Sequence, residues 1–448
     1  MSESGRVHVV GAGLAGLAAA VMSAGQGRRV TLYEASAHAG GRCRSFFDGE
    51  LGCRIDNGNH LLLSGNRAAL DYLHRIGAVD AFEGPAEPIL PFVDLRDGQR
   101  WVLQPNRGKL PWWVLSRARR VPGTRARDYL APLKLRRAAA SATVAEVLDP
   151  NSLSYRRLWE PMAVAALNTQ ASRASARLFG DLVAETLGRG GEACRPLVPR
   201  QGLSESFVDP ALATLRAHGA AIRFGTRLRS LRFAGDAVAE LVLDAGSIPV
   251  GADDAVVLAV PAAVAARLVP GLVVPDAYAP IVNAHFRCSA PGGTPLLLGI
   301  VGGTAEWVFR KREVLSVTVS AADRIVHLPP GTLRQQLWAD VARALELPPA
   351  PLPPARIVKE RRATFLATPE QLRRRPPTET QWQNLLLAGD YVATGLPATI
   401  EGAIRSGLAA ARYWSERLPD AHVKRRMTDD LIAGSMIAAD RERERALP

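Results

Sequence analysis

Short apolar runs and helical patterns follow one another at the start of the chain. Residues 7–10 form a short apolar run that predicts a buried parallel strand. A glycine turn at residues 11–16 and an alanine-rich helix to about residue 24 come next, and residues 29–33 predict a second strand. Parallel strands joined by a helix are the βαβ unit, so this order predicts an α/β fold.

The same patterns return later in the chain. Strands are predicted at residues 220–231, 237–243, 255–260, 314–320 and 385–388. Apolar and polar residues alternate cleanly in the 314–320 run. Helical spacing marks residues 66–76, 333–345 and 399–414. Residues 40–64, rich in Gly, Arg and Asn, are expected to form a loop, and residues 348–354 a stiff connector.

Because strand patterns recur after each intervening segment, we predict a discontinuous dinucleotide-binding domain. We expect it to combine residues 1–85, 195–280 and 380–420. Residues 86–194, which carry Pro and Trp and then become Ala-rich, and residues 281–379 are expected to form an inserted substrate- and membrane-facing domain. Residues 421–448 read as a charged and loose tail.

Length and composition indicate a folded enzyme of more than one domain. The chain has 448 residues, 47% of them hydrophobic and 22% charged, with a net charge of +13. Such a charge suits nucleic acid, an anionic membrane or an acidic ligand, and an arginine-rich surface due to codon bias is the simpler alternative. Zinc-finger spacing and an RNP-like aromatic box are absent from the sequence, so no nucleic-acid partner is predicted.

Cysteine usage and hydropathy place the chain in a reducing, cytoplasmic setting. The four cysteines form no CxxC pair, so neither a metal site nor a disulfide framework is predicted (Cys43, Cys53, Cys194 and Cys288). The N-terminus has no apolar signal-peptide core, and no stretch of about 18 uninterrupted apolar residues is present. The sequence therefore predicts no membrane span.

The first glycine turn has the GxGxxG spacing of a dinucleotide grip. Gly11 permits the tight turn, Gly13 lets a phosphate approach the backbone, and Gly16 lets the helix pack on the strand. Free N–H groups at the helix start then hold the pyrophosphate. Glu34, 18 residues after Gly16, ends the second strand where it can bond a ribose hydroxyl, and it disfavours a 2′-phosphate.

A second glycine turn follows at Gly40-Gly41-Arg42, and Gly389-Asp390 precedes a Thr399-Ile400-Glu401-Gly402-Ala403 segment. Together these resemble the flavoprotein superfamily of amine oxidases and phytoene desaturases. The resemblance implies a Rossmann-like FAD-binding domain of the glutathione-reductase type with an inserted α+β substrate domain. It also implies that Arg42 neutralises the pyrophosphate, that Asp390 contacts the ribityl or phosphate region, and that the backbone at Leu228 meets the adenine. The residues expected to bind FAD are Gly11, Gly13, Leu14, Ala15, Gly16, Glu34, Ala35, Gly40, Gly41, Arg42, Gly58, Asn59, His60, Leu228, Gly389, Asp390, Thr399, Ile400 and Ala403.

Three further segments narrow the resemblance. Residues 55–63 (IDNGNHLLL), 165–169 (AALNT) and 394–403 (TGLPATIEGA) together resemble the bacterial squalene-associated flavoproteins, the hydroxysqualene dehydroxylases of the hopanoid pathway. The resemblance extends to about residue 414. Asn59 stands where that family usually has Gln, and residues 64–66 (SGN) where Gly-Ala-Tyr is common. The implied reaction is reductive removal of an allylic hydroxyl from a long isoprenoid, to give squalene.

Loss of a hydroxyl as water needs a proton donor. We expect His60 to be that donor, with Asp56 orienting it and Glu401 as a second choice. His60 as a group that only packs on the cofactor, and Asp56 as a cap of its own loop, are the alternatives. Asn168 and Thr169 are expected to bond the substrate hydroxyl, and a helix C-terminal cap explains them equally well.

A basic and aromatic segment, residues 107–137, is the candidate membrane contact. It holds ten basic residues against one acid, interleaved with apolar side chains that include Trp112 and Trp113. Arginine suits anionic headgroups and tryptophan suits the interface, so peripheral docking on the inner face of the cytoplasmic membrane is expected. An exposed basic helix with its other face in the core is the alternative.

Three other functions share the cofactor motifs. A carotenoid-type desaturase would run in the oxidative sense. An amine oxidase often uses a lysine near the flavin, and none of the five lysines lies in a flavin motif, although Lys311 and Lys359 cannot be placed from the sequence. A non-catalytic prenyl-lipid carrier would not need Glu34, Arg42 and Asp390 together. The sequence does not identify the oligomeric state or the electron donor.

Overall fold

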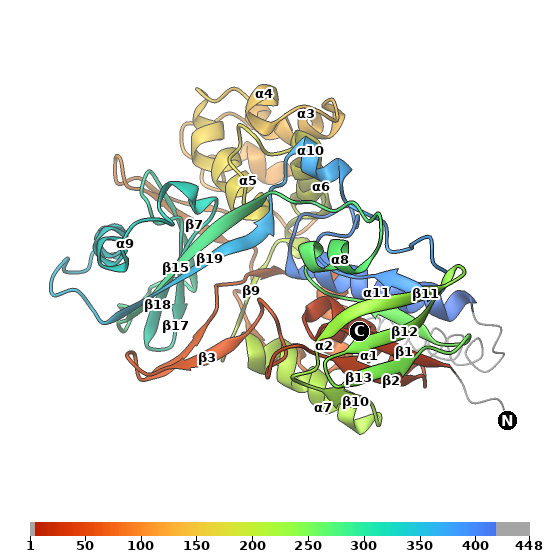
Figure 1. The fold of residues 1–448 in the computed structure, drawn as a ribbon. Coiled ribbons are helices and arrows are strands. Elements are labelled where there is room, and N and C mark those ends of the chain that lie inside the picture. Colours follow the sequence, from red (N-terminus) through yellow and green to blue (C-terminus); the bar gives the residue numbers. More distant parts are fainter. Residues whose placement is uncertain (1–4, 418–448) are drawn as a thin grey trace, which may run out of the picture.

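A five-stranded parallel sheet forms the nucleotide-binding end of the protein. The structure, a computed structural model, describes residues 5–417. The strand order is β10-β2-β1-β14-β20, and every neighbouring pair is parallel. Its strands are β1 (Arg6–Val10), β2 (Arg29–Tyr33), β10 (Ala221–Arg223), β14 (Ala255–Leu258) and β20 (Leu385–Leu387). The sheet thus joins segments that are far apart in the sequence (Figure 1).

Both faces of this sheet are covered, which explains why its strands are almost continuously apolar. Alternate side chains point to opposite faces, so Val9 and Val257 face one layer while Val10 and Leu258 face the other. The first layer holds helices α1 (Leu14–Gly25), α2 (Arg67–Arg75), α7 (Asp209–Ala217) and α11 (Ile400–Arg417). The second holds α8 (Ala262–Leu268) and the sheet of β11 (Leu228–Ala234), β12 (Ala237–Leu243) and β13 (Gly246–Pro249).

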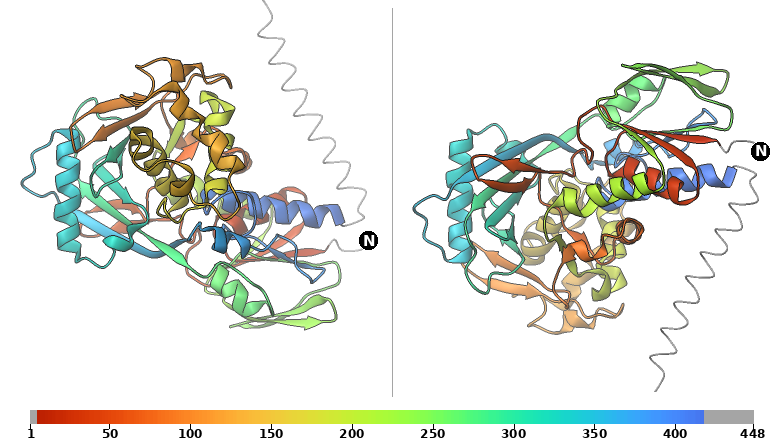
Figure 2. Two further views of the ribbon diagram at one scale, coloured as in Figure 1. Left: turned by 90° about the horizontal axis from the view of Figure 1, so that it is seen from above. Right: turned by 90° about the horizontal axis from the view of Figure 1, so that it is seen from below.

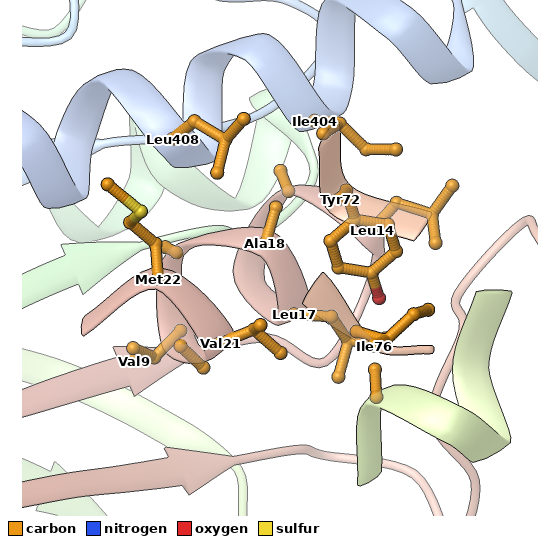
Figure 3. Packing of buried hydrophobic residues seen from close by; sticks show 14 of the residues in the cluster. Val9, Leu14, Leu17, Ala18, Val21, Met22, Tyr72, Ile76, Ile404 and Leu408 are labelled. Carbon is orange, nitrogen blue, oxygen red and sulfur yellow. The ribbon is translucent and has the colours of Figure 1, made fainter. Parts of the chain in front are cut away.

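Helix α1 lies between the sheet and α11, as Figure 3 shows for the side chains of Leu17, Val21 and Leu408. Its small residues permit this close packing. A Cβ atom added to Gly407 of α11 would lie under 3.0 Å from the carbonyl oxygen of Ala15 in α1. Contact between two helix backbones therefore fixes the start of α1, where the glycine turn ends.

A seven-stranded sheet forms the second body of the protein. Its order is β19-β15-β18-β17-β16-β7-β8, and α9 (Pro330–Leu345) packs against one face. Figure 2 shows α9 along the outer side of this sheet. The strands are β7 (Leu90–Asp94), β8 (Arg100–Leu103), β15 (Tyr278–Arg287), β16 (Leu297–Val301), β17 (Trp307–Lys311), β18 (Val314–Val319) and β19 (Ala355–Phe365).

A helical lobe lies above the place where the two sheets meet in Figure 1. It buries its own aromatic core, which includes Trp113, Trp159 and Phe179. Its helices are α3 (Ala131–Arg137), α4 (Val144–Val147), α5 (Glu160–Leu167) and α6 (Ala176–Glu185). The remaining elements are β3 (Ser45–Asp48), β4 (Cys53–Asp56), β5 (Leu62–Leu63), β6 (Phe82–Glu83), β9 (Pro196–Pro199) and α10 (Pro369–Arg373).

Most of the predicted strands and helices are confirmed, and one expectation is wrong. Residues 40–64 are not a loop throughout, because β3 and β4 pair as an antiparallel hairpin there. Strands β7 and β8, from residues 86–194, join β15 to β19, which lie almost entirely within residues 281–379, in the seven-stranded sheet. The strand predicted at residues 314–320 is confirmed as β18, and all six of its residues are buried.

Within residues 5–417, no helix combines the length and the apolar character that crossing a membrane requires. The predicted tail at residues 421–448 lies outside the described residues.

Candidate functional site

The two glycine turns lie side by side at the carboxyl end of β1. Gly13 and Gly40 form an isolated parallel bridge, and the Gly40 N–H donates to the carbonyl oxygen of Ala12 at 2.8 Å. A Cβ atom on Gly11, Gly16 or Gly40 would collide with backbone, whereas one on Gly13 would meet nothing within 4 Å. The space in front of Gly13 is therefore open, at the point where a phosphate must approach.

The start of α1 offers unoccupied donors to that space. Gly13 is the N-cap residue, and no side chain caps this end of the helix. The first amides of a helix have no intrahelical partner, so those of Leu14 and Ala15 are free to bind an anion. Glu34, at the end of β2, accepts from the N–H groups of Ala12 and Ser36, both at 2.8 Å, and thereby holds its carboxylate beside the glycine turn. Ala35 is exposed next to it.

Arg42 and Asp390 meet each other. Their side chains form an ion pair with Nη2 2.8 Å from Oδ2, and Arg42 also donates to the carbonyl oxygen of Ala363 at 2.5 Å. The negative charge of Asp390 raises the pKa of Arg42. Gly389, just before Asp390, is held by its N–H donating to the Ser406 hydroxyl in α11 at 2.8 Å. The pair thus connects the second glycine turn to the C-terminal motif.

The segment after Asp390 is held by a buried guanidinium. Arg375 donates to the carbonyl oxygens of Asp390, Tyr391, Val392 and Leu396, and burial lowers its pKa to about 10. The segment leads into α11, whose first turn is capped by the Thr399 hydroxyl accepting from the Gly402 N–H at 3.1 Å.

The other expected cofactor contacts have the following positions. Ile400 is buried and Ala403 is partly buried at the start of α11. Leu228 is buried at the start of β11, and Thr226 just before it donates from its N–H to the Glu34 carbonyl oxygen at 2.8 Å. Leu228 therefore lies where the segment between β10 and β11, which is hydrogen-bonded to the end of β2, leads into β11.

These features fit an adenine dinucleotide. The open space at Gly13 and the uncapped helix start accept a pyrophosphate, and an arginine held by an aspartate lies on the adjoining turn. The phenolic oxygen of Tyr391, next to Asp390, is buried and has no hydrogen-bond partner within residues 5–417. The free amides and the arginine thus form a binding site for an anion, and the Tyr391 hydroxyl adds a polar group beyond the position of the phosphates.

Asp56 is the centre of a buried polar cluster. Its Oδ2 lies 2.6 Å from the Lys311 Nζ, and its Oδ1 accepts from the Ser45 hydroxyl at 2.6 Å and from the Leu203 N–H at 2.9 Å. Burial alone would raise the pKa of Asp56, but Lys311 and these hydrogen bonds outweigh it and lower that pKa. Asp56 is therefore a fixed carboxylate, and its partner is Lys311.

His60 lies on the loop that follows β4, close to this ion pair. Burial lowers its pKa to about 4, Asp56 opposes the shift, and the charges of Lys311 and Arg42 add to it. A histidine with such a pKa is neutral at pH 7. His60 as the proton donor and Asp56 as the group that orients it stay predictions, and a neutral His60 would have to receive the proton that it passes on.

One face of the seven-stranded sheet is polar where it meets the loop of residues 57–60. Asn283 and His285 of β15 pair with Thr318 and Ser316 of β18. The Thr318 hydroxyl donates to Asn283 at 2.8 Å and accepts from the Asn59 side chain at 3.0 Å. A Cβ atom added to Gly58 would approach the Asn283 amide to 3.1 Å, so the loop lies directly on the sheet.

Sequence reasoning missed this polar face. Burial lowers the pKa of His285 to about 4, and its Nδ1 is 2.5 Å from the Ser316 hydroxyl. The signal that was available is the polar Asn and His inside the otherwise apolar run of residues 281–286. A buried polar residue is more informative than an exposed one, but burial is not visible in a single sequence.

Glu401 has no free oxygen for a substrate. Its two carboxylate oxygens accept from the N–H groups of Ala68 and Ala69 at the start of α2, at 3.1 and 2.8 Å, and Arg405 lies at 3.2 Å. Acidic groups stabilise helix N-termini in this way. The expected role of Glu401 as a second proton donor is thus corrected to that of a cap on α2.

Asn168 and Thr169 are corrected in the same sense. Asn168 ends α5 in a left-handed conformation, with φ 46°, and its amide bonds the Ala279 carbonyl oxygen, the Thr364 hydroxyl and the Ala321 N–H. The Thr169 hydroxyl donates to the Leu167 carbonyl oxygen and accepts from the Ala367 N–H. Both side chains are buried and occupied, so they join the lobe to the sheets and leave nothing for a substrate hydroxyl.

Comparison with known proteins gives a consistent result. Residues 14–413 match the family model of flavin containing amine oxidoreductases. Hydroxysqualene dehydroxylase from Sinorhizobium fredii is 48% identical over 405 residues, which are 90% of this chain and 97% of the relative. The hydroxysqualene dehydroxylase of Rhodopseudomonas palustris is 48% identical over 406 residues, with the same coverage.

Solved structures share the fold at low sequence identity. Putrescine oxidase bound to putrescine has a TM-score of 0.65 at 16% identity, and it covers 92% of this chain and 99% of its own. Cyclohexylamine oxidase from Brevibacterium oxydans also has a TM-score of 0.65, at 18% identity, with 93% and 100% coverage. The predicted α/β fold with a Rossmann-like FAD-binding domain is confirmed by this likeness, which shows the fold alone.

Proposed function

The chain belongs to the flavin containing amine oxidoreductases and, within them, to the hydroxysqualene dehydroxylases, and from this premise we propose that it reductively removes the hydroxyl group of hydroxysqualene to give squalene. The observation that carries the proposal is the 48% identity over nearly the whole length of both chains. FAD is the cofactor of this family.

We propose positions for the pyrophosphate and the ribose of FAD. We assign the pyrophosphate to the start of α1 and the open face of Gly13, with Arg42 beside it, and the ribose to the Glu34 carboxylate. Bound in its reduced form, FAD supplies the hydride. Loop 58–60, with Asn59 and His60, would lie between the cofactor and the polar face of the seven-stranded sheet.

The protein must also help the hydroxyl group to leave. Hydroxide is a poor leaving group, so a proton has to reach the oxygen as the C–O bond breaks. Neutral His60 carries one N–H donor and one acceptor nitrogen, so it can bond the hydroxyl and pass a proton onward. Its low pKa follows from burial, the condition under which such a hydrogen bond is strong.

A direct conversion assay tests the proposal. The purified protein, reduced under anaerobic conditions, is mixed with hydroxysqualene, and the flavin absorbance and the products are followed. We expect reduced flavin to be oxidised and squalene to form in equal amounts. If oxidised flavin is consumed by a polyene instead, the protein is a desaturase and the proposal is wrong.

The lack of a lysine in the flavin motifs no longer argues against an amine oxidase, because Lys311 lies next to Asp56 at the candidate site. The structural likeness to putrescine oxidase does not favour it, since 16% identity shows the fold alone. The hydroxysqualene dehydroxylase of Sinorhizobium fredii is 48% identical to this chain, three times the identity of putrescine oxidase. Anaerobic mixing with primary amines is expected to leave oxidised flavin unchanged.

We propose in addition that residues 107–137 dock to a membrane surface, from which a long isoprenoid substrate is taken up. Half of the ten exposed large apolar side chains among residues 5–417 fall in this segment: Leu110, Trp112, Leu115, Leu130 and Leu133. They are interleaved with the ten basic residues. Apolar side chains that enter the headgroup region next to basic ones are the features of a peripheral membrane contact.

The two tryptophans differ in this respect. Trp112 is 55% exposed, with Arg119 over its ring, whereas Trp113 is 4% exposed and packs edge-on against Tyr129. Trp113 is therefore core, not membrane contact. A suitable test changes Leu110 and Leu115 to Ser, with Val79→Ser/Val273→Ser as the control pair of exposed residues elsewhere. We expect only the first pair to weaken binding to anionic vesicles, and equal binding by both would refute the docking proposal.

A further inference from the structure

Lys311 is mostly buried, although it is the last residue of a strand, where the chain turns back. It is the last residue of β17, its side chain is only 16% exposed, and its Nζ lies 2.6 Å from Asp56 Oδ2. The other oxygen of Asp56 is taken by Ser45 and Leu203. The carboxylate is thus fixed by three donors, and one of them is an ammonium that can release a proton.

The ion pair lies where four segments of the chain converge. These are β4 with Asp56, the following loop with His60, β15 with His285, and β17 with Lys311 itself. The charge of Lys311 lowers the pKa of both histidines, and that of Asp56 raises them. Arg42 also acts on His60, and Asp48 on His285. The register of the sheet puts Lys311 on the same face as Ser316 and His285, and Asn59, next to His60, bonds Thr318 on that face.

The reaction requires a proton as well as a hydride. The C–O bond breaks with its electron pair on oxygen, the carbon receives a hydride from the reduced flavin, and the oxygen takes one proton and leaves as water. The substrate gains two electrons and the flavin loses two. Neutral His60 relays a proton but holds no spare one, and Arg42 does not deprotonate in a protein. Of the cations acting on His60, Lys311 is the one with a releasable proton.

We propose that Lys311 is the proton source of the active site: held by Asp56, its ammonium supplies through His60 the proton that converts the departing hydroxyl to water. This inference rests on the proposed reductive dehydroxylation. The exposed fraction of Lys311 is large enough for water to return the proton after each turnover. Lys311 does not touch the substrate. It supplies the proton to His60, which passes it to the departing hydroxyl.

Three variants separate proton supply from structural support. Lys311→Met removes the charge and the proton, and Lys311→Arg keeps the charge and the bond to Asp56 but releases no proton. Lys359→Met is the control, because Lys359 lies in the same sheet but donates to the Leu328 carbonyl oxygen, outside the cluster. Flavin content and thermal stability report whether each variant folds.

The rate of flavin oxidation by hydroxysqualene in a single turnover is the first measurement. General acid catalysis contributes on the order of 10²–10⁴-fold, so we expect a loss of at least about a hundredfold in both Lys311 variants. The control is expected to keep the wild-type rate. A Lys311→Arg variant that binds flavin and reacts at the wild-type rate would overturn the proposal, because charge alone would then suffice. In Lys311→Ala, added ethylammonium is expected to restore at least part of the lost rate, and absence of any rescue would count against the proposal.

A second measurement does not depend on the substrate. NMR titration of the histidine rings is expected to show higher pKa values for His60 and His285 in Lys311→Met than in the wild type, and no change in Lys359→Met. Unchanged histidine titration would show that Lys311 is not at the site. If the wild type itself fails to convert hydroxysqualene while the titrations shift as expected, the proposed function fails, and the placement of Lys311 stands.

Discussion

The Arg42–Asp390 pair joins the second glycine turn to the C-terminal motif of the FAD cradle. Arg42→Met leaves Asp390, which is 14% exposed, without its cation and removes a positive charge from the pyrophosphate side. Hydrogen bonds to charged groups contribute about 1.5–3 kcal/mol, so the dissociation constant of FAD should rise on the order of ten- to a hundredfold. Isothermal titration of the apoprotein with FAD measures it.

Arg44→Met serves as the matched control for this prediction, because Arg44 is exposed two residues away. Its affinity for FAD is expected to equal that of the wild type. Equal affinities for Arg42→Met and Arg44→Met would exclude Arg42 from the cofactor site.

Buried histidines should make the protein sensitive to acid. The pKa of His285 falls from 6.5 to about 4 on folding because the side chain is buried. Between these values the unfolded chain binds a proton that the folded protein does not, so the free energy of unfolding decreases as the pH falls from 6.5 to 4. His285→Gln removes this proton, and the slope of stability against pH should become shallower by about 1.4 kcal/mol per pH unit.

Urea titrations of the two proteins between pH 4.5 and 6.5 give these slopes. His8 and His60, whose pKa values are also lowered, remain in both proteins, so their contributions cancel in the comparison. Parallel stability curves would contradict the lowered pKa of His285.

At the residue scale, sequence reasoning identified the positions where the backbone admits only glycine. It failed for polar side chains that can serve either a substrate or a helix end. Gly11, Gly13 and Gly40 were recognisable because each position either closes on backbone or must stay open. Asn168 and Glu401 were misassigned because the same polar groups that bind a substrate also satisfy helix ends. Which of the two occurs depends on a partner more than a hundred residues away in the chain.

At the element scale, the packing of α11 on α1 controls the position of the FAD cradle. Gly407→Ala would place a Cβ atom under 3.0 Å from the Ala15 carbonyl oxygen in the first turns of α1. Overpacking of this kind costs about 1–3 kcal/mol, and the helix start should shift with it. We expect a lower unfolding temperature and weaker FAD binding. Gly331→Ala in α9 meets nothing within 4 Å, so it should be no less stable than the wild type, and a similar loss in both variants would disprove the packing argument.

The elements that were predicted correctly are those with a strong local pattern. Strands β1 and β2, and helices α1, α9 and α11, each show an apolar run or helical spacing that local sequence fully displays. The β3–β4 hairpin was missed because each strand has only four residues, too few for a periodic pattern to stand out. Strand β18 was predicted, but the partners of its polar residues were not. Ser316 and Thr318 pair with His285 and Asn283 of β15, which lie across the sheet and far away in the sequence.

At the scale of the whole molecule, the candidate site is a product of topology. Asp56, His60, His285 and Lys311 come from segments up to 255 residues apart, and no spacing in the sequence predicts that they meet. The glycine turns could be read from residues 11–42 alone, whereas the polar cluster exists only because the seven-stranded sheet brings β15, β17 and β18 under the loop after β4. Cofactor identity was therefore accessible from sequence, whereas the meeting of Asp56 with Lys311 and the polar face of the sheet was not.

The net charge of +13 predicts that vesicle binding depends on salt. Each basic side chain near an anionic surface contributes about 1 kcal/mol at low ionic strength, and a Debye length of about 10 Å at 0.1 M shortens to about 3 Å at 1 M. Binding to anionic vesicles should therefore weaken steeply with salt, while the apolar contribution from Leu110 and Leu115 persists. Lys109→Gln/Arg117→Gln, two exposed residues of the docking segment, should reduce this salt dependence, and Arg216→Gln/Arg227→Gln, exposed on the nucleotide-binding body, should not. Co-sedimentation across a salt series distinguishes the outcomes, because a general effect of charge would lower binding equally in both pairs and would exclude residues 107–137 as the oriented contact.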